Sequence, residues 1–308
     1  MQRYIVIRLV YALIALFTVS IIVFALARIS GSPLDAMLPD DATEQDREQV
    51  KRAWGLDRPL HVQYVVYLNN ALRGNFGDSI RWSGKTAGEM VLSRLPATLE
   101  LAALALVVSI ILALPIGVIA AVKKDSPVDY VGKIVALLGQ SLPTFWLGIV
   151  LMWVFAVYLG WLPTSGSGGI QHMVLPAIAL GWYQVAAIMR LTRSSMLEVL
   201  DSEFVKLARV KGVPEWKVIW KHCLRNAAVT PVTYFGLILG SFLAGSVAIE
   251  TVFAWPGIGQ LAIDALRSRD FPVVQTVVLF FALGYIVSNL LVDILYAYLD
   301  PRIREVTA

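Results

Sequence analysis

One short stretch, SGKT at Ser83–Thr86, has the residue types of a nucleotide-binding loop. Such a loop needs the pattern G-x-x-x-x-G-K-[ST] directly after a strand, so that backbone amides and the lysine surround the phosphates. The first glycine would stand at position 79, where the sequence has Ser79, and no strand pattern precedes it. We therefore expect no ATP binding by this chain.

The residue types that hold metals are few and widely separated. Cys223 is the single cysteine, so an intrachain disulfide is impossible and a cysteine-based metal site is not expected. The histidines, His61, His172 and His222, do not stand at ligand spacing. We expect a non-catalytic chain that itself binds no cofactor.

The composition is that of a membrane protein. Of 308 residues, 57% are hydrophobic and 16% are charged, whereas soluble domains average about 45–50% apolar and about 25% charged. A membrane helix needs about 20 apolar residues. Six segments meet this need: Leu9–Ala27, Ala97–Val122, Val131–Leu159, His172–Leu191, Ala227–Ala248 and Val273–Leu299. The predicted fold class is an all-α integral membrane protein with six transmembrane helices.

The first apolar segment has a second interpretation, as a cleaved signal peptide. Arg3 and Arg8 precede it, and the small residues Ala25–Ala27 resemble a cleavage site. The apolar core of a signal peptide is about 7–15 residues long, shorter than this run. We favour a membrane helix.

Lysine and arginine are unevenly distributed along this chain. In membrane proteins generally, these residues are enriched in cytoplasmic loops. With the N-terminus inside, fifteen of the 26 lie at inner ends of spans, whereas the short outer loops hold only Arg267 and Arg269. We place both termini in the cytoplasm of a multi-pass protein. The expected divisions are a cytoplasmic N-terminus with the first span (1–29), an outer helical insertion (30–96), a five-helix core (97–299) with a cytoplasmic loop (192–226), and a cytoplasmic C-terminus (300–308).

The outer segments contain short helix patterns. In the insertion, Asp41 or Thr43 can cap a helix that Gly55 ends, and a second helix runs from Pro59 to Gly74. In the later loop, WPGIG predicts a turn. Helical spacing follows at Ile258, Leu261, Ala262, Ala265 and Leu266. A membrane-surface helix and a part of an outer gate or docking surface both remain open.

Several residues could line a pathway or an outer gate. They are Phe145, Trp182, Tyr234, Trp255, Pro256 and Ile258. Apolar spans mostly make helix-packing contacts, so packing is the favoured interpretation of the aromatic residues inside the spans.

The segment EFVKLARVKGVPEWKVIWKH, Glu203–His222, is a basic stretch between two spans. One helical face carries Leu197, Leu200, Phe204, Leu207 and Ala208. Gly212 can end this helix, and Pro214 with Glu215 can begin another. The pattern fits either an amphipathic pair on lipid headgroups or a lever that fits a groove on a soluble partner.

VKLARVKG followed by KVIWKHCLRNA resembles the cytoplasmic loop of ABC-transporter permeases, whose pattern is E-A-A, three residues, G, nine residues, I-x-L-P. Ala208, Gly212 and Leu224 match this pattern. The departures are Lys206, Leu207, His222 and Arg225. The resemblance is closer to the dipeptide/oligopeptide branch, where A-R-A-K-G and H-x-L-R-N-A are usual. It continues through RGNFGDSIR, RLPATLEL, SLPTFWLGI, LGWLPTSG, LTRSSMLEVL, ETVFAWPGIGQL and LDPRIR, and so covers nearly the whole chain.

The resemblance implies the type I importer permease fold in a bacterial inner membrane. It also implies a second homologous permease subunit, two cytoplasmic ATPase subunits that bind ATP and Mg²⁺, and a periplasmic or extracellular substrate-binding protein. No nucleic-acid partner is expected. By resemblance, Gly212–Trp220 is the coupling helix. The implied ATPase-binding residues are Glu203, Ala208, Arg209, Lys211, Gly212, Val213, Pro214, Trp216 and Lys217.

The transported substrate is less well defined than the type of transporter. Peptides are the first expectation, and an importer of nickel, glutathione, opines or small oligosaccharides would share the architecture. An ion-coupled secondary transporter is a weaker alternative, because no acid or base stands convincingly at mid-membrane. An ion channel is a further alternative.

Overall fold

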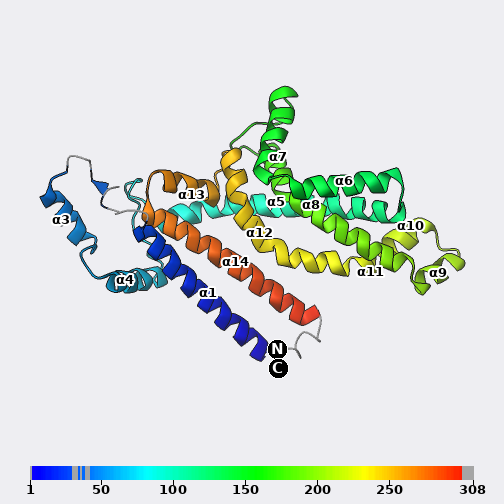
Figure 1. The fold of residues 1–308 in the computed structure, drawn as a ribbon, viewed down its shortest axis with the longest axis horizontal. Helices are drawn as coiled ribbons and strands as arrows, with labels where there is room; N and C mark the ends of the chain where they lie inside the picture. The colour runs from blue at the N-terminus through cyan, green and yellow to red at the C-terminus, as the bar shows by residue number, and fades with distance from the viewer. Residues whose placement is uncertain (1, 30–33, 35–36, 39–41, 300–308) are drawn as a thin grey trace. The chain divides into compact units, whose positions relative to one another are not determined.

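The computed structural model describes residues 2–29, 34, 37–38 and 42–299, which form helices, loops and one isolated β-bridge between Asp78 and Thr86 (Figure 1). The chain forms two compact units. The first combines Met1–Leu99 with Pro256–Ala308, and the second is Glu100–Trp255. The predicted all-α class is confirmed.

The first unit is built on two long apolar helices, α1 (Gln2–Ile29) and α14 (Phe271–Leu299), which pack along each other (Figure 1). The short helix α13 (Ile258–Arg267) packs on α14, as its apolar spacing predicts. Its apolar face joins the beginning of α5 (Ala87–Val122) in one core. The buried residues of this core are Ala87, Val91, Ile258, Leu261, Ala265, Val273 and Val277.

The two helices expected in the insertion are confirmed as α3 (Glu44–Ala53) and α4 (Leu60–Leu72). Thr43 caps α3 through a capping box, in which its side chain accepts from the Asp46 amide and the Asp46 carboxylate accepts from the Thr43 amide. Gly55 and Gly74 follow the two helices with φ of 63° and 78°, which only glycine adopts cheaply. The alternative cap, Asp41, lies outside the described residues.

The second unit is organised around α8 (Ile170–Leu200), which packs on α6 (Pro127–Ser141), α7 (Thr144–Leu151) and α12 (Val229–Val252). Small residues bring α5 and α8 together. A Cβ atom on Gly117 would lie 2.8 Å from the carbonyl oxygen of Met189, and one on Gly181 would lie 2.8 Å from that of Ala105. Close backbone approach at small residues is typical of helices packed in membranes.

The expected spans are only partly continuous helices. Four described helices are long and apolar enough to cross a membrane: Ile5–Ile29, Ala87–Val122, Ile170–Leu200 and Phe271–Ile294. A bent pair, Pro127–Ser141 with Thr144–Tyr158, would make a fifth. The segment Ala227–Ala248 begins at the last residue of α11 (Leu224–Ala227) and continues into α12, whose fully described apolar part includes Gly240–Val252.

Two boundaries are corrected by the structure. Val131–Leu159 is not one straight helix, because it bends by 110° between Ser141 and Thr144. Leu142 is extended there (ψ 130°), the conformation that Pro143 imposes on the residue before it. The helix of the second span begins at Ala87 rather than Ala97, since Thr86 and Glu89 exchange capping hydrogen bonds of 3.2 Å.

Candidate partner-binding site

The segment Glu203–Ala227, here called the elbow, consists of four short helical pieces. They are α9 (Glu203–Val210), α10 (Glu215–Lys217), the π-helical turns η2 (Val218–Cys223) and α11 (Leu224–Ala227). The expected continuous helix through Leu200 is wrong. Ser202 is extended (ψ 150°), and its hydroxyl donates to the Val199 carbonyl at 2.6 Å, so the chain turns between α8 and α9.

The turn at Gly212 has the geometry that the sequence predicts. Gly212 has a φ of 73°. Its amide donates to the Arg209 carbonyl at 2.9 Å, and the Val213 amide donates to the Ala208 carbonyl at 3.1 Å. This pair of bonds is the Schellman motif, which satisfies the last carbonyls of a helix. The motif sets the angle at which the chain leaves α9 for α10.

One face of the elbow is anchored on the membrane helices of its own unit. Val205, Val218 and Cys223 are fully buried against side chains of α5 and α8. The complete buried cluster is Val118, Ala121, Met196, Val205, Val218, Cys223 and Ala227. An elbow held by a packed core moves together with the helices that support it.

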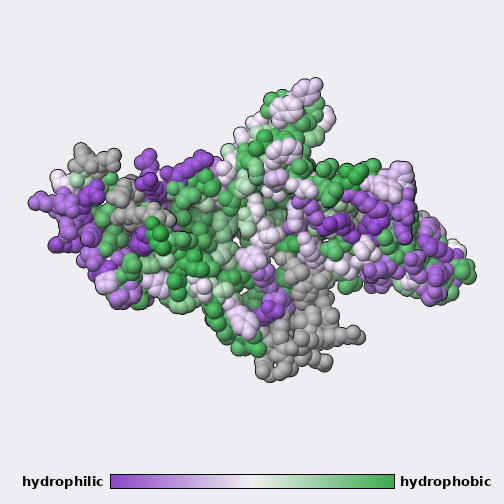
Figure 2. Space-filling model, in the orientation of Figure 1, coloured by the Kyte–Doolittle hydropathy of each residue, from purple (hydrophilic) through white to green (hydrophobic). Residues whose placement is uncertain are grey.

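The other face of the elbow exposes large apolar side chains. Val210 is 84% exposed, Trp216 63% and Leu207 54%. The apolar helical face expected from the sequence is therefore partly wrong, because the side chains of Phe204 and Leu207 are exposed whereas that of Val205 is buried. Figure 2 shows hydrophobic and hydrophilic residues mixed over α9 and α10. Apolar side chains exposed together and rimmed by charges are typical of an interaction surface.

Charged side chains of the elbow make local contacts. Arg209 donates to the Glu215 carboxylate at 2.7 and 3.3 Å and so ties α9 to α10 across the Gly212 turn. Glu203 pairs with Lys206 at 2.7 Å, and the ammonium of Lys217 lies 5.4 Å from the ring centre of Trp216. Lys211 and Pro214 are exposed. All nine predicted ATPase-binding residues thus lie in the elbow, where Ala208 and Val213 pack partly against its buried core.

We expect the link between Arg209 and Glu215 to weaken in acid. The hydrogen bond from Arg209 lowers the pKa of Glu215 below its ordinary value. Its stabilising effect is therefore fully present above the unfolded pKa of about 4.3 and disappears as the pH falls through the lower folded value. Both side chains are half-exposed, so the effect is below about 1 kcal/mol.

Amide hydrogen exchange of residues 213–217 measures this effect in Glu215→Gln and in the wild type. We expect faster exchange in the variant at pH 7 and a smaller difference at pH 3. Glu203→Gln is the matched control, because the pair of Glu203 with Lys206 lies within α9. A difference that persists unchanged at pH 3 contradicts the assignment.

A buried ion pair between α6 and α8 has no counterpart among the sequence predictions. Asp129 of α6 is fully buried and accepts from Arg193 of α8 at 2.6 and 2.8 Å. Lys133 approaches the same carboxylate at 2.9 Å. The available signal was an acid at the start of an apolar helix, but the sequence does not show which base faces it. The pair fastens α6 to α8.

The pathway candidates belong to two units and have different surroundings. In the second unit the Tyr234 hydroxyl donates to Gln184 Oε1 at 3.2 Å, and Gln184 donates to Ser241 at 3.2 Å. Trp182 has a buried indole nitrogen without a hydrogen-bond partner in the described residues. Phe145 is exposed and Trp255 is buried. In the first unit Pro256 is partly buried and Ile258 is buried, with its amide donating to Thr98 at 2.8 Å. Their pathway role stays a prediction, and sequence reasoning missed Gln184 and Ser241.

Two family models match this chain. "Binding-protein-dependent transport system inner membrane component" covers residues 113–305, and a model of the N-terminal part of the membrane component of binding-protein-dependent transport systems covers residues 1–102. The chain therefore belongs to the family of inner-membrane permease components of binding-protein-dependent ABC importers, as the sequence resemblance predicts.

Curated relatives match over their full length. The chain is 37% identical to the oligopeptide transport system permease protein AppB of Bacillus subtilis (strain 168), over 99% of this chain and 100% of that protein. It is 40% identical to the glutathione transport system permease protein GsiC of Escherichia coli (strain K12), over 99% of each. A crystal structure of an amino acid ABC transporter with histidines superposes with a TM-score of 0.51 at 18% identity, covering 70% of this chain and 94% of that one. This last likeness supports the fold alone.

Proposed function

We propose that this chain forms half of the translocation pathway of an importer for small peptides. The names of the two relatives support this cargo class, because one is a permease for oligopeptides and the other for the tripeptide glutathione. Glutathione itself is the first alternative. In this proposal the second half of the pathway is a homologous permease subunit, and an external binding protein delivers the substrate.

In this proposal, transport is driven by ATP hydrolysis in a pair of cytoplasmic ATPase subunits, which bind ATP and Mg²⁺ and dock on the elbow. This places both termini in the cytoplasm and makes the present chain a non-catalytic subunit. The observation that carries the proposal is the apolar face of Leu207, Val210 and Trp216 on an element whose opposite face is packed into a core. A short helix presenting apolar anchors is a common way to dock into a groove.

The proposed transmission runs through packed side chains. Closure of the ATPases would displace the elbow, and its buried residues Val205 and Val218 would carry α5 and α8 along. The close approach of these helices at Gly117 and Gly181 leaves no space for independent sliding. Dense packing transmits displacement rather than absorbing it.

Docking is tested by placing a charge in the proposed contact. We expect Trp216→Asp to reduce the amount of ATPase that copurifies with the detergent-solubilised complex by roughly tenfold or more, as for loss of an interface anchor worth about 2 kcal/mol. Transport should fall in parallel, while the membrane level of the chain stays unchanged.

Trp161→Asp is the matched control, because Trp161 is also an exposed tryptophan of the second unit, at 69% exposure. It should leave ATPase copurification at the wild-type level. Full ATPase association by Trp216→Asp, and also by Leu207→Asp, would exclude this face as the docking surface. Titrating the copurified external protein with dipeptides and with glutathione tests the cargo separately.

A further inference from the structure

A polar cavity of about 200 Å³ lies within the first unit, where α1 ends and α14 begins. The helix α4 of the insertion covers it. Its polar side chains are Arg28, Arg58, Gln63, Tyr67, Asn70 and Gln275. The polar-to-apolar boundary of a bilayer lies at the ends of spanning helices, so this cavity stands at headgroup level.

Three buried polar atoms at this cavity lack hydrogen-bond partners among the described residues. They are Nε of Arg28, Oε1 of Gln63 and the hydroxyl oxygen of Tyr67. The side-chain nitrogen of Gln63 donates to the carbonyls of Arg58 at 2.7 Å and Leu56 at 3.3 Å. This fixes the amide orientation and leaves its oxygen as a free acceptor. Buried polar groups without partners are costly, so three at one cavity indicate a polar ligand.

The three atoms define the chemistry of that ligand. Arg28 offers a charged donor, and its guanidinium is positioned 5.0 Å from the ring centre of Phe24. Burial raises the pKa of Tyr67, so its hydroxyl keeps its proton and can donate. Gln63 supplies an acceptor. The complementary ligand has an anionic group for Arg28 and Tyr67 and a hydrogen-bond donor for Gln63.

A second, apolar cavity of about 430 Å³ adjoins the first, because Tyr67 and Phe76 line both. It runs along α1, α4 and α14 in the same unit. The apolar side chains of its wall include Phe17, Leu68, Leu72, Leu279, Phe280 and Leu283. A ligand that fills both cavities therefore has a charged head and an aliphatic tail.

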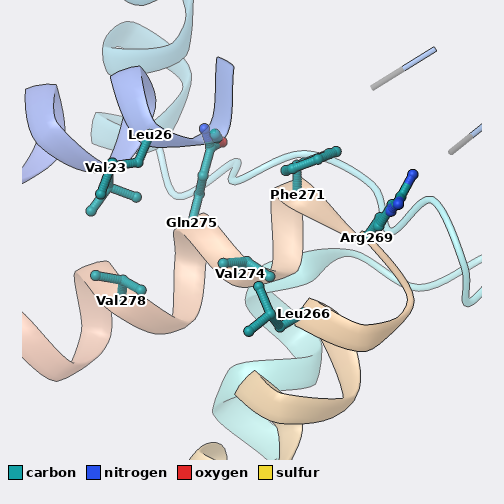
Figure 3. A pocket seen from close by; sticks show the side chains of 9 residues that line it. Val23, Leu26, Leu266, Arg269, Phe271, Val274, Gln275 and Val278 are labelled. Atoms are coloured by element: carbon teal, nitrogen blue, oxygen red, sulfur yellow. The ribbon is translucent and has the colours of Figure 1, made fainter. Parts of the chain in front are cut away.

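Gln275 adds a neutral polar group to the headgroup end. Its side chain extends from α14 toward the last turns of α1 (Figure 3). It also lines a third cavity, of about 410 Å³, whose other side chains are mainly apolar, among them Val23, Leu26 and Val274. The polar cavity is thus flanked by apolar space on two sides, a pattern that fits a lipid better than a free ion.

We infer that these cavities form a binding site for one glycerophospholipid whose headgroup carries a hydrogen-bond donor. The phosphate would bind Arg28 and Tyr67, a headgroup hydroxyl or ammonium would donate to Gln63, and an acyl chain would occupy the apolar cavity. The lipid would complete the contact between the insertion helix α4 and α1. A phosphatidylcholine headgroup lacks a donor and would leave the Gln63 oxygen unpaired.

Native mass spectrometry of the full chain with dioleoyl phosphatidylglycerol tests the site. We expect Arg28→Gln and Tyr67→Phe each to weaken binding of the first lipid by roughly tenfold to a hundredfold, as for loss of a hydrogen bond to a charged group. Phosphatidylcholine should bind the wild type several-fold more weakly than phosphatidylglycerol. Glycerophosphoglycerol, which lacks acyl chains, and a dipeptide should not displace the bound lipid.

Two matched controls keep the test specific. Tyr64→Phe removes a hydroxyl from the same helix, where Tyr64 bonds Ser20 at 2.8 Å and lines neither cavity. Arg52→Gln removes a charge from the exposed helix α3. Both should bind the first lipid like the wild type. Wild-type affinity in Arg28→Gln and Tyr67→Phe overturns the proposal. Displacement by the headgroup alone, or by the dipeptide, also overturns it by assigning the cavity to another ligand.

Discussion

Gly212→Pro is expected to abolish coupling between ATP hydrolysis and transport. Proline fixes φ near −65°, whereas Gly212 has a φ of 73°. Proline also removes the amide that bonds the Arg209 carbonyl at 2.9 Å. The Schellman turn cannot form, so α10 leaves α9 at a different angle. A penalty of about 3 kcal/mol corresponds to a roughly hundredfold smaller population of the docking geometry.

The measurement is substrate uptake together with ATPase activity in proteoliposomes that contain the whole complex. We expect uptake to fall toward background while residual ATP hydrolysis no longer depends on substrate. Gly212→Asn is the matched control, because asparagine tolerates the left-handed conformation and a Cβ at this position meets nothing within 4 Å. It should retain most of the transport. Wild-type uptake by Gly212→Pro in an assembled complex would disprove the role of this turn.

Local signals in the sequence are sufficient to predict the turn at Gly212 and the helix ends in the insertion. Thr43 with Asp46, Gly55, Gly74 and Gly212 act through bonds within a few residues of themselves. The backbone conformations of these residues are set mainly by residues close in sequence, because helix caps and left-handed helix ends form through local hydrogen bonds. The elements around these residues were therefore predictable, as was the membrane class from hydrophobicity.

The orientation of the elbow depends on distant residues and was only partly predictable. Periodicity places Phe204 and Leu207 with Ala208, but the core formed with Val118 and Met196 selects Val205. Helical spacing shows that a face exists without showing which neighbour covers it. The surface left exposed is consequently visible only in the fold.

The bend in the third span illustrates a competition between signals. Its hydropathy predicts one continuous span, yet Pro143 forces Leu142 into an extended conformation and the helix divides. A proline within an apolar run can either kink a helix or end it, and Pro176 lies inside the continuous helix α8. The presence of a proline in an apolar run therefore does not by itself show which of the two outcomes the chain adopts.

The buried pair of Asp129 and Arg193 supports the second large prediction, a loss of stability in Arg193→Met. Asp129 has no exposure to solvent and depends on two bonds from Arg193, at 2.6 and 2.8 Å. Removing one partner of a buried pair costs about 3–5 kcal/mol, because the other charge stays buried. Lys133, at 2.9 Å from the same carboxylate, should keep the loss toward the lower end of that range.

The unfolding midpoint in SDS or on heating measures this loss. Exposed Lys206 pairs with Glu203 at 2.7 Å, so Lys206→Met is the matched control and should cost less than about 1 kcal/mol. The double variant Asp129→Leu with Arg193→Met should recover most of the stability, because no unpaired charge remains buried. If Arg193→Met and Lys206→Met unfold alike, the pair does not fasten α6 to α8. If the double variant is stable but transports poorly, the pair positions α6 against α8 for transport in addition to stabilising them.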